Sequence, residues 1–253
     1  MILKRLKDNV AQENWFAVTV EIIVVVLGIF LGFQLTDWDQ DRKDRAEERL
    51  YLERLHDDMV TQINEMDLRM DYLGKAMTDN GIVVTYLTDP KATDRPAPRI
   101  LTAFYNSSVI FPFAPFSLTY EELLSTGKTP IIRDLELRKN IAKYFYDTAP
   151  LMDAWNIDDN NAYRELIRGE MPYHYQMMAA TACEPMANRM IADCAIDVSE
   201  AAAKDALDDL QKVEGIKRLA TLNLTRLSIA LRLYRENITL AKQMKDQLKA
   251  ASD

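Results

Sequence analysis

The sequence is poor in glycine, histidine and cysteine, and it contains no long run of basic residues. Its 253 residues include 7 Gly, 9 Pro, 2 His and 2 Cys. So little glycine and proline excludes a collagen-like or low-complexity chain, and two cysteines are too few for a disulfide scaffold. Two His and two Cys also leave too few ligands for a multi-site zinc or iron–sulfur protein. We therefore expect neither a metal site nor a cofactor.

The charge balance argues against a nucleic-acid partner. The chain carries 39 acidic and 31 basic side chains, a net charge of −8, and its Lys and Arg residues are interleaved with acids. A surface that follows a phosphate backbone needs clustered, unneutralised cations. The 48% of hydrophobic residues is enough for a sizeable core.

The strongest positive signal lies near the N-terminus. Residues 15–35 read WFAVTVEIIVVVLGIFLGFQL, with Glu21 as the only ionisable group. Their apolar side chains favour insertion by roughly −4 to −8 kcal/mol, against about +2.5 to +3.5 kcal/mol for one central acid. Trp15 and Trp38 bracket the stretch, as expected for rings at the two headgroup layers. We predict a transmembrane helix over 15–38, with the lipid bilayer as its partner.

Two other interpretations of this stretch are weaker. Lys4, Arg5 and Lys7 precede it like the basic start of a signal peptide, but the apolar run is too long and no small-residue cleavage site follows. The segment 22–33 is apolar on all sides, whereas a surface helix of a soluble domain keeps a polar face. The sequence thus favours an uncleaved anchor.

One face of the predicted membrane helix carries small and acidic residues. Gly28 and Gly32 form a small-xxx-small pair, and Glu21 lies seven residues before Gly28, about 20° away around the helix. Glycines allow a second helix to approach closely, and an intramembrane carboxyl is expected to face protein or water. We predict self-association or docking on a larger membrane complex. The alternative, that Gly is merely common there and Glu21 reaches water, stays open.

The orientation of the helix is not decided by its flanks, because basic residues lie on both sides. Cys183 and Cys194 could form a disulfide, which would favour an oxidising compartment, or could be two core thiols. We expect the C-terminal side to lie outside the cytoplasm.

Residues 39–88 predict one long helix that leaves the membrane as a stalk, since they lack proline and pair acids with bases three or four positions apart. Gly74 and Gly81 are candidate bends, and Asp89-Pro90 should end the helix. The apolar positions form a coiled-coil-like seam with one four-residue irregularity: Leu52, Leu55, Met59, Ile63, Met66, Met70 and Leu73.

The remainder predicts shorter helices and one long C-terminal helix. Thr119 with Glu122 fits a capping box, Gly127 fits a helix stop, and Asp134 fits an N-cap. Three aromatics, Phe111, Phe113 and Phe116, are expected between helices.

After a hinge at Gly215, residues 216–250 carry two apolar stripes, which indicate burial between two neighbours. The first stripe is Leu224, Leu227, Leu231, Tyr234, Ile238, Ala241 and Leu248, and the second is Leu222, Ile229, Leu233, Leu240 and Met244.

These patterns predict an all-α protein in which a membrane helix continues into a stalk and a four-helix-bundle-like domain. The expected organisation is a short cytoplasmic tail (1–14), the transmembrane helix (15–38), the stalk (39–88) and a helical bundle packing back on it (89–253).

No reactive constellation stands out. Glu53-x-x-His56 has di-iron spacing but lacks the further Glu residues that such a site needs, so His56, Asp57 and Asp58 are interpreted as a solvated face. No nucleophile elbow occurs, and the GKT at 127–129 is followed by Pro130, which a phosphate-binding loop would not tolerate. We predict neither catalytic nor cofactor-binding residues and no enzyme activity.

The segment Asn14–Trp38, with the pattern NW…E…GxxxGxQxxxW, resembles a bacterial family of single-pass inner-membrane proteins of unknown function. The acidic-basic stretch DQDRKDR that follows and the segment YLERLHDD are similar to that family as well, and YEELLSTGKTPIIRDLELRKNIAKYFY resembles its central helical region. The resemblance implies a helical fold with a C-terminal part in the periplasm, and it supplies no catalytic residues.

We therefore expect a non-enzymatic scaffold, accessory or assembly subunit. A periplasmic ligand-binding sensor, with a pocket lined by Met177, Met178 and the aromatics of 111–116, is the first alternative. An enzyme of unrecognised class is the second.

Overall fold

The computed structural model describes residues 15–109, 118–148, 161–183 and 190–252. The chain divides into two compact units, Met1–Tyr51 and Leu52–Asp253. The predicted stalk, 39–88, is therefore shared between them, because its second part belongs to the C-terminal unit.

The first helix, α2 (Trp15–Thr88), is 74 residues long. It runs through the candidate bends Gly74 and Gly81 without a break. The helix ends before Pro90, as predicted, and the Asp89 carboxylate accepts a hydrogen bond from the backbone N–H of Lys91 in the short helix η1 (Pro90–Ala92).

The buried face of α2 follows a regular heptad once its polar members are counted. Gln62 is 1% exposed, Arg69 is 9% exposed and Asn80 is fully buried. With them the spacing alternates regularly between three and four residues, whereas Met70 is only half-buried. The predicted seam missed Gln62 and Arg69 because only apolar residues had been considered, whereas Ile63 is buried as predicted. The buried seam positions are Leu52, Leu55, Met59, Gln62, Met66, Arg69, Leu73, Ala76, Asn80, Val83 and Leu87.

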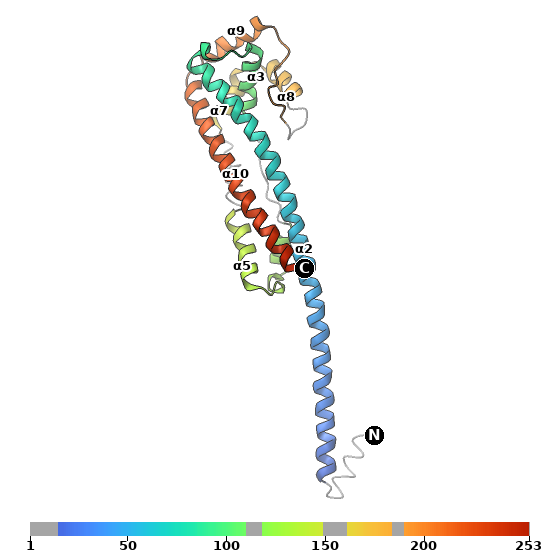
Figure 1. The fold of residues 1–253 in the computed structure, drawn as a ribbon. Coiled ribbons are helices and arrows are strands. Elements are labelled where there is room, and N and C mark those ends of the chain that lie inside the picture. The colour runs from blue at the N-terminus through green and yellow to red at the C-terminus, as the bar shows by residue number, and fades with distance from the viewer. Residues whose placement is uncertain (1–14, 110–117, 149–160, 184–189, 253) are drawn as a thin grey trace. The chain divides into compact units, whose positions relative to one another are not determined.

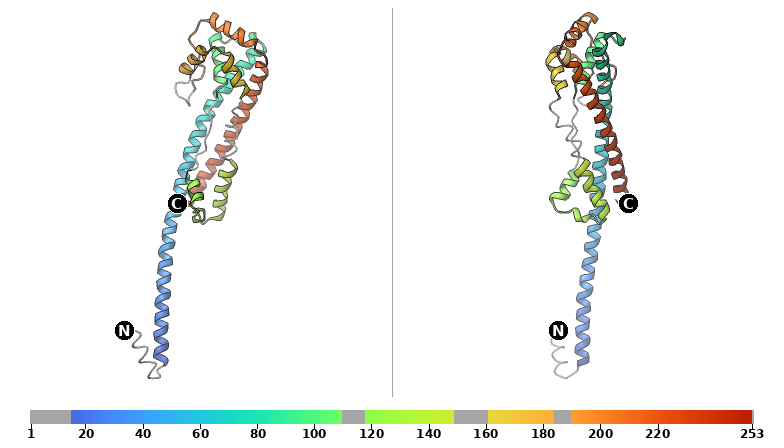
Figure 2. Two further views of the ribbon diagram at one scale, coloured as in Figure 1. Left: turned by 180° about the vertical axis from the view of Figure 1, so that it is seen from behind. Right: turned by 90° about the vertical axis from the view of Figure 1, so that its left-hand side faces the viewer.

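The last helix, α10 (Ile216–Ser252), packs antiparallel to the C-terminal part of α2 (Figures 1 and 2). Asn223 of α10 donates a hydrogen bond to Asn80 of α2. Arg69, eleven residues earlier in α2, interacts electrostatically with Tyr234, eleven residues later in α10. The opposite directions of these two steps are those of antiparallel helices. One buried seam of α10 has spacings of three or four residues, with a step of seven between Leu227 and Tyr234. Its members are Ile216, Ala220, Asn223, Leu227, Tyr234, Asn237, Ala241, Met244 and Leu248. The expectation of two buried stripes was wrong in part, since Leu222 and Leu240 are exposed.

Short helices pack at the two ends of this pair (Figure 1). At one end, α3 (Ala97–Ser107) contacts α7 (Ala162–Glu170), α8 (Tyr173–Cys183) and α9 (Glu200–Gln211). At the other end, α5 (Leu135–Lys143) and the π-helical turn η3 (Tyr144–Thr148) contact α10. The helix α4 (Leu118–Ser125) and the turn η2 (Thr129–Ile131) precede α5. The places of the third and fourth bundle helices are thus filled by short helices.

The start of α4 differs from the prediction. Thr119 lies inside the helix, and its backbone N–H donates to Asp58 Oδ2 of α2 at 3.0 Å. The proposed capping box of Thr119 and Glu122 was therefore wrong. Asp58 is also not part of a solvated face, because it is only 7% exposed.

The predicted helix stop at Gly127 and the predicted N-cap at Asp134 are confirmed. Gly127 has a φ of +67°, and the backbone N–H groups of Gly127 and Lys128 donate to the carbonyls of Leu124 and Leu123. This pair of bonds is the Schellman motif, in which glycine closes a helix. Asp134 caps α5 by accepting from the N–H groups of Glu136 and Leu137. The all-α class is confirmed, and no strand occurs in the ranges that the structure describes.

Candidate functional site

The N-terminal part of α2 is the one described helix long and apolar enough to cross a membrane. Its large apolar side chains are exposed between Val20, at 43%, and Leu35, at 67%, whereas Val18 is 7% exposed. Leaving such a side chain in water costs about 1.5–3 kcal/mol relative to burial. A surface of this extent is stable only against lipid or other apolar groups.

Hydrogen bonding within this segment suits a bilayer. The two hydroxyl side chains, Thr19 and Thr36, each donate to the carbonyl four residues earlier, Trp15 at 2.8 Å and Gly32 at 3.0 Å. A polar group in hydrocarbon needs a partner inside the protein. Trp15 and Trp38, the predicted interface anchors, are 70% and 64% exposed.

The predicted interface residues Glu21, Gly28 and Gly32 all lie on this unbroken helix, which places them on one face. A Cβ atom added at Gly28 or Gly32 would meet nothing within 4 Å. Glu21 is half-exposed. No described part of the chain packs on the two glycines, so a second helix has room to approach there.

The stretch from 39 to 50 is a solvated, ion-paired helix. Lys43 pairs with Asp39 at 2.7 Å, Arg45 pairs with Asp41, and Gln40 Nε2 donates to Asp44 at 2.7 Å. The hydrogen bond that Lys43 donates to the Asp39 carboxylate raises the pKa of Lys43 above its ordinary value. Such exposed pairs add little to the stability of the fold, and they favour helix formation and solubility.

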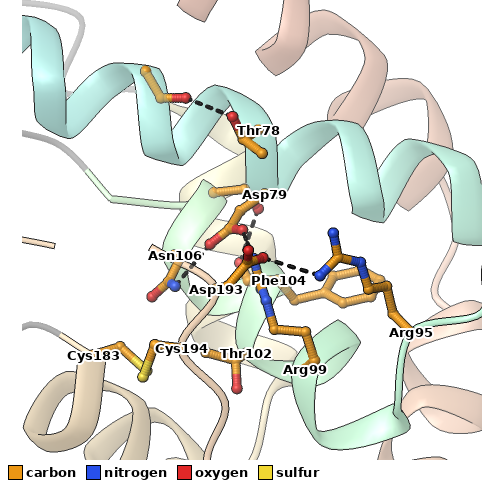
Figure 3. A network of polar contacts seen from close by, with 12 residues as sticks. Thr78, Asp79, Arg95, Arg99, Thr102, Phe104, Asn106, Cys183, Asp193 and Cys194 are labelled. Atoms are coloured by element: carbon orange, nitrogen blue, oxygen red, sulfur yellow. Dashed lines mark hydrogen bonds and ion pairs between the residues drawn. A yellow bond between two sulfur atoms is a disulfide. The ribbon is translucent and has the colours of Figure 1, made fainter. Parts of the chain in front are cut away.

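A second group of polar residues is buried between α2 and α3 (Figure 3). Arg99 of α3 is 4% exposed and pairs with Asp79 of α2, which is 3% exposed. Asn106 Nδ2 donates to the other oxygen of Asp79 at 2.8 Å. Among the described residues, Nε and one terminal nitrogen of Arg99 have no partner. Removing either charge would leave the other buried and uncompensated.

The segment 190–196, which we name the latch, fastens onto this group. Lys75 Nζ of α2 donates to the carbonyl of Met190 at 3.0 Å, and the N–H of Ile196 donates to Thr102 Oγ1 of α3 at 3.0 Å. Between them, the Asp193 carboxylate accepts from Arg95 at 3.1 Å and lies 3.6 Å from Arg99 (Figure 3).

A disulfide joins Cys183, at the end of α8, to Cys194 in the latch, with Cα atoms 5.5 Å apart. Asp193, beside Cys194, has a φ of +52°, a left-handed conformation that is unfavourable for a residue with a side chain. The disulfide and the two arginines hold it there.

Simple energetics indicate that the disulfide decides whether the latch stays in place. Ordering seven residues costs roughly 10 kcal/mol of backbone entropy. Burial of Met190 and Ile196 returns about 2 kcal/mol each. Four hydrogen bonds, which join Met190 to Lys75, Ile191 to Cys183, Asp193 to Arg95 and Ile196 to Thr102, return about 1 kcal/mol each. A disulfide closing a loop of this length contributes about 3 kcal/mol, so the balance is close to zero only when the bond is present.

A further polar cluster joins α10 to the same region. Asn223 Nδ2 donates to the carbonyl of Ser107 at 2.8 Å and to Asn80 Oδ1 at 3.2 Å, while Asn80 Nδ2 donates to the carbonyl of Ala220 at 2.8 Å. Ser107 also bonds the Tyr163 hydroxyl at 2.7 Å. Burial raises the pKa of Tyr163, so its hydroxyl stays protonated. These bonds fix the register of α2 against α10 and α3.

At the other end of the pair, the Tyr144 hydroxyl donates to Gln62 at 2.5 Å. Burial raises the pKa of Tyr144, and it raises the pKa of Tyr234 to about 12. The bond between Tyr144 and Gln62 thus ties η3 to α2.

The structure describes only part of the ligand pocket that the alternative function predicts. Met177 is 45% exposed and Met178 is half-buried, while Phe111, Phe113 and Phe116 lie outside the described residues. Within the described ranges, no group of three His, Cys, Asp or Glu could hold a metal ion.

Sequence reasoning did not find Asp79, Arg99, Asn106 and Asp193. A signal was present for the neighbouring Asn80, because it falls on the heptad that contains Met59, Met66 and Leu73. A polar residue at such a position specifies register. No comparable signal marks Asp193.

Comparisons with protein-family models, with curated proteins and with solved structures returned no match.

Proposed function

We propose that this chain is a non-enzymatic, membrane-anchored helical protein that acts as a scaffold, accessory or assembly subunit. It associates with a second copy or with a larger membrane complex through the face of α2 that carries Glu21, Gly28 and Gly32. The observation that supports this most directly is the open space at both glycines, which lie on an apolar helix.

The chemistry of this face suits helix association. Lipid gives no hydrophobic drive for two membrane helices to meet, so they associate through close packing of small residues and through polar groups. The glycines provide the close approach, and Glu21 provides a group that gains from a protein partner.

We further propose that the C-terminal unit, Leu52–Asp253, lies in the periplasm of a bacterium, with the anchor in the inner membrane. The disulfide between Cys183 and Cys194 supports this orientation, because disulfides persist in oxidising compartments and are rare in the cytosol. The resemblance of the N-terminal segment to a bacterial inner-membrane family supports it as well.

The association is tested by photo-crosslinking in native membranes. A photoreactive amino acid replaces Val24, close to the glycine face, and crosslinked bands are compared for the parent, Gly28→Leu with Gly32→Leu, and Glu21→Gln. We expect the double leucine variant to lose most of the crosslinked product, since two side chains then hold the partner helix away.

The matched control is Val26→Leu, which enlarges a side chain on the opposite face of the same helix and should leave the bands unchanged. If the double leucine variant inserts normally and keeps every homo- and hetero-oligomeric band, the assigned face is wrong. A reporter fused after Asp253 that is active only in the cytoplasm would overturn the orientation.

A further inference from the structure

We propose that the disulfide between Cys183 and Cys194 is a redox switch that holds the latch, residues 190–196, in place. A dithiol reductant reduces this disulfide and frees the latch from α2 and α3, while the pair of α2 and α10 stays folded. This inference is independent of the proposed membrane association.

The disulfide lies where it can hold the latch on α2 and α3. The latch reaches α2 through Lys75 and reaches α3 through Arg99 and Thr102. It also contacts Arg95, which precedes α3. Cys194 follows Asp193 directly, so the covalent bond acts at the center of these contacts (Figure 3).

The two sulfur atoms differ in access. Cys183 is fully buried at the end of α8, whereas Cys194 is half-exposed. A thiolate from solution therefore attacks Cys194 Sγ, and the bonding electron pair leaves on Cys183 Sγ, which takes up a proton. The second thiolate of the dithiol then attacks the other sulfur of the same reductant molecule, which is bonded to Cys194 in the mixed disulfide. Cys194 leaves as a thiolate and is protonated, and the reductant becomes a cyclic disulfide.

Reduction changes the latch without removing the contacts beneath it. Asp193 is no longer held in a left-handed conformation, and it is 67% exposed, so it moves into solvent readily. Arg99 keeps its buried pair with Asp79, and Asn106 keeps its bond to the same carboxylate. The bonds of Asn80 to Ala220 and Asn223 involve no latch residue. The release is therefore local.

The test is amide hydrogen exchange read by mass spectrometry on the full chain in detergent micelles. The oxidised protein is compared with protein reduced by dithiothreitol and with protein reoxidised afterwards. We expect peptides covering the latch to exchange at least ten-fold faster after reduction and to regain protection on reoxidation. Peptides covering 234–248 of α10 should change by less than two-fold.

Two variants sharpen the result. The double variant Cys183→Ser with Cys194→Ser should exchange fast at the latch and should not respond to dithiothreitol. Asp193→Asn keeps the disulfide but weakens the ion pairs, and it should give a smaller increase that remains sensitive to reductant.

Equal latch protection in the oxidised and reduced protein would overturn the inference. So would exchange in α10 that rises in step with the latch, because the bond would then support the whole unit. Alkylation that finds both thiols free in the purified protein would overturn it as well.

Discussion

The two parts of α2 lie on one continuous helix, yet their surroundings are opposite. Between 22 and 33 the large apolar side chains are all exposed, whereas Leu55 and Met59 are completely buried. The first part is apolar on every side and the second part is apolar on one face only. Helix formation is therefore common to both parts, and the angular distribution of apolar residues decides whether a part meets lipid or other helices.

The largest effect is expected from charges in the apolar part. Val24→Lys combined with Leu27→Lys adds about 5–7 kcal/mol to the free energy of membrane insertion, comparable to the whole apolar gain of the segment. We expect the chain to move from the membrane pellet to the supernatant after carbonate extraction.

The same two changes at Leu50 and Leu68, which are exposed in α2 outside the apolar segment, should leave the chain in the pellet. A double lysine variant at 24 and 27 that remained fully membrane-embedded would contradict the assigned anchor.

The next effect concerns the buried pair in the C-terminal unit. Arg99→Met leaves Asp79 without its cation, and we expect a loss of about 3–5 kcal/mol in the free energy of unfolding. Urea denaturation of the full chain in micelles, followed by circular dichroism, measures it. The double variant Asp79→Leu with Arg99→Met should lose clearly less than Arg99→Met alone. Equal losses would show that the charge pair is not what matters at this site.

A direct comparison along α2 uses two leucines five residues apart. Leu55 is fully buried and Leu50 is 53% exposed. We expect Leu55→Ala to lower the free energy of unfolding by about 2–5 kcal/mol and Leu50→Ala to change it by less than about 0.5 kcal/mol. The same urea titration decides the matter, and similar losses at both positions would place the boundary between the two units elsewhere.

The smallest effect concerns neighbouring aspartates. Asp58 caps α4, whereas the carboxylate of Asp57 is 82% exposed. Asp58→Ala should lose about 1 kcal/mol, and Asp57→Ala should lie within about 0.5 kcal/mol of the parent. If the order of the two losses were reversed, the cap would be wrongly assigned.

The sequence was sufficient for features that depend on local pattern. The long apolar helix follows from its length and composition, and the ends at Asp134, Gly127 and Pro90 follow from backbone chemistry. Each of these signals acts within a few residues of its effect.

Features that depend on distant residues were not predicted. Asp58 and Asp57 have the same side chain, and only the position of α4, sixty residues later, decides which one is buried. Gln62 and Asn80 bond Tyr144 and Asn223, which come from remote parts of the chain. The heptad marks the position of Asn80, but the partner of a buried polar residue is known only once the fold brings the two together.

The capping of α4 by Asp58 also bears on the order of folding. A helix of eight residues is too short to persist alone in water, and here the carboxylate that stabilises its first turn comes from α2. Nucleation of α4 therefore waits until the antiparallel pair has begun to consolidate. Substitutions within α4 should accelerate unfolding and leave the refolding rate nearly unchanged.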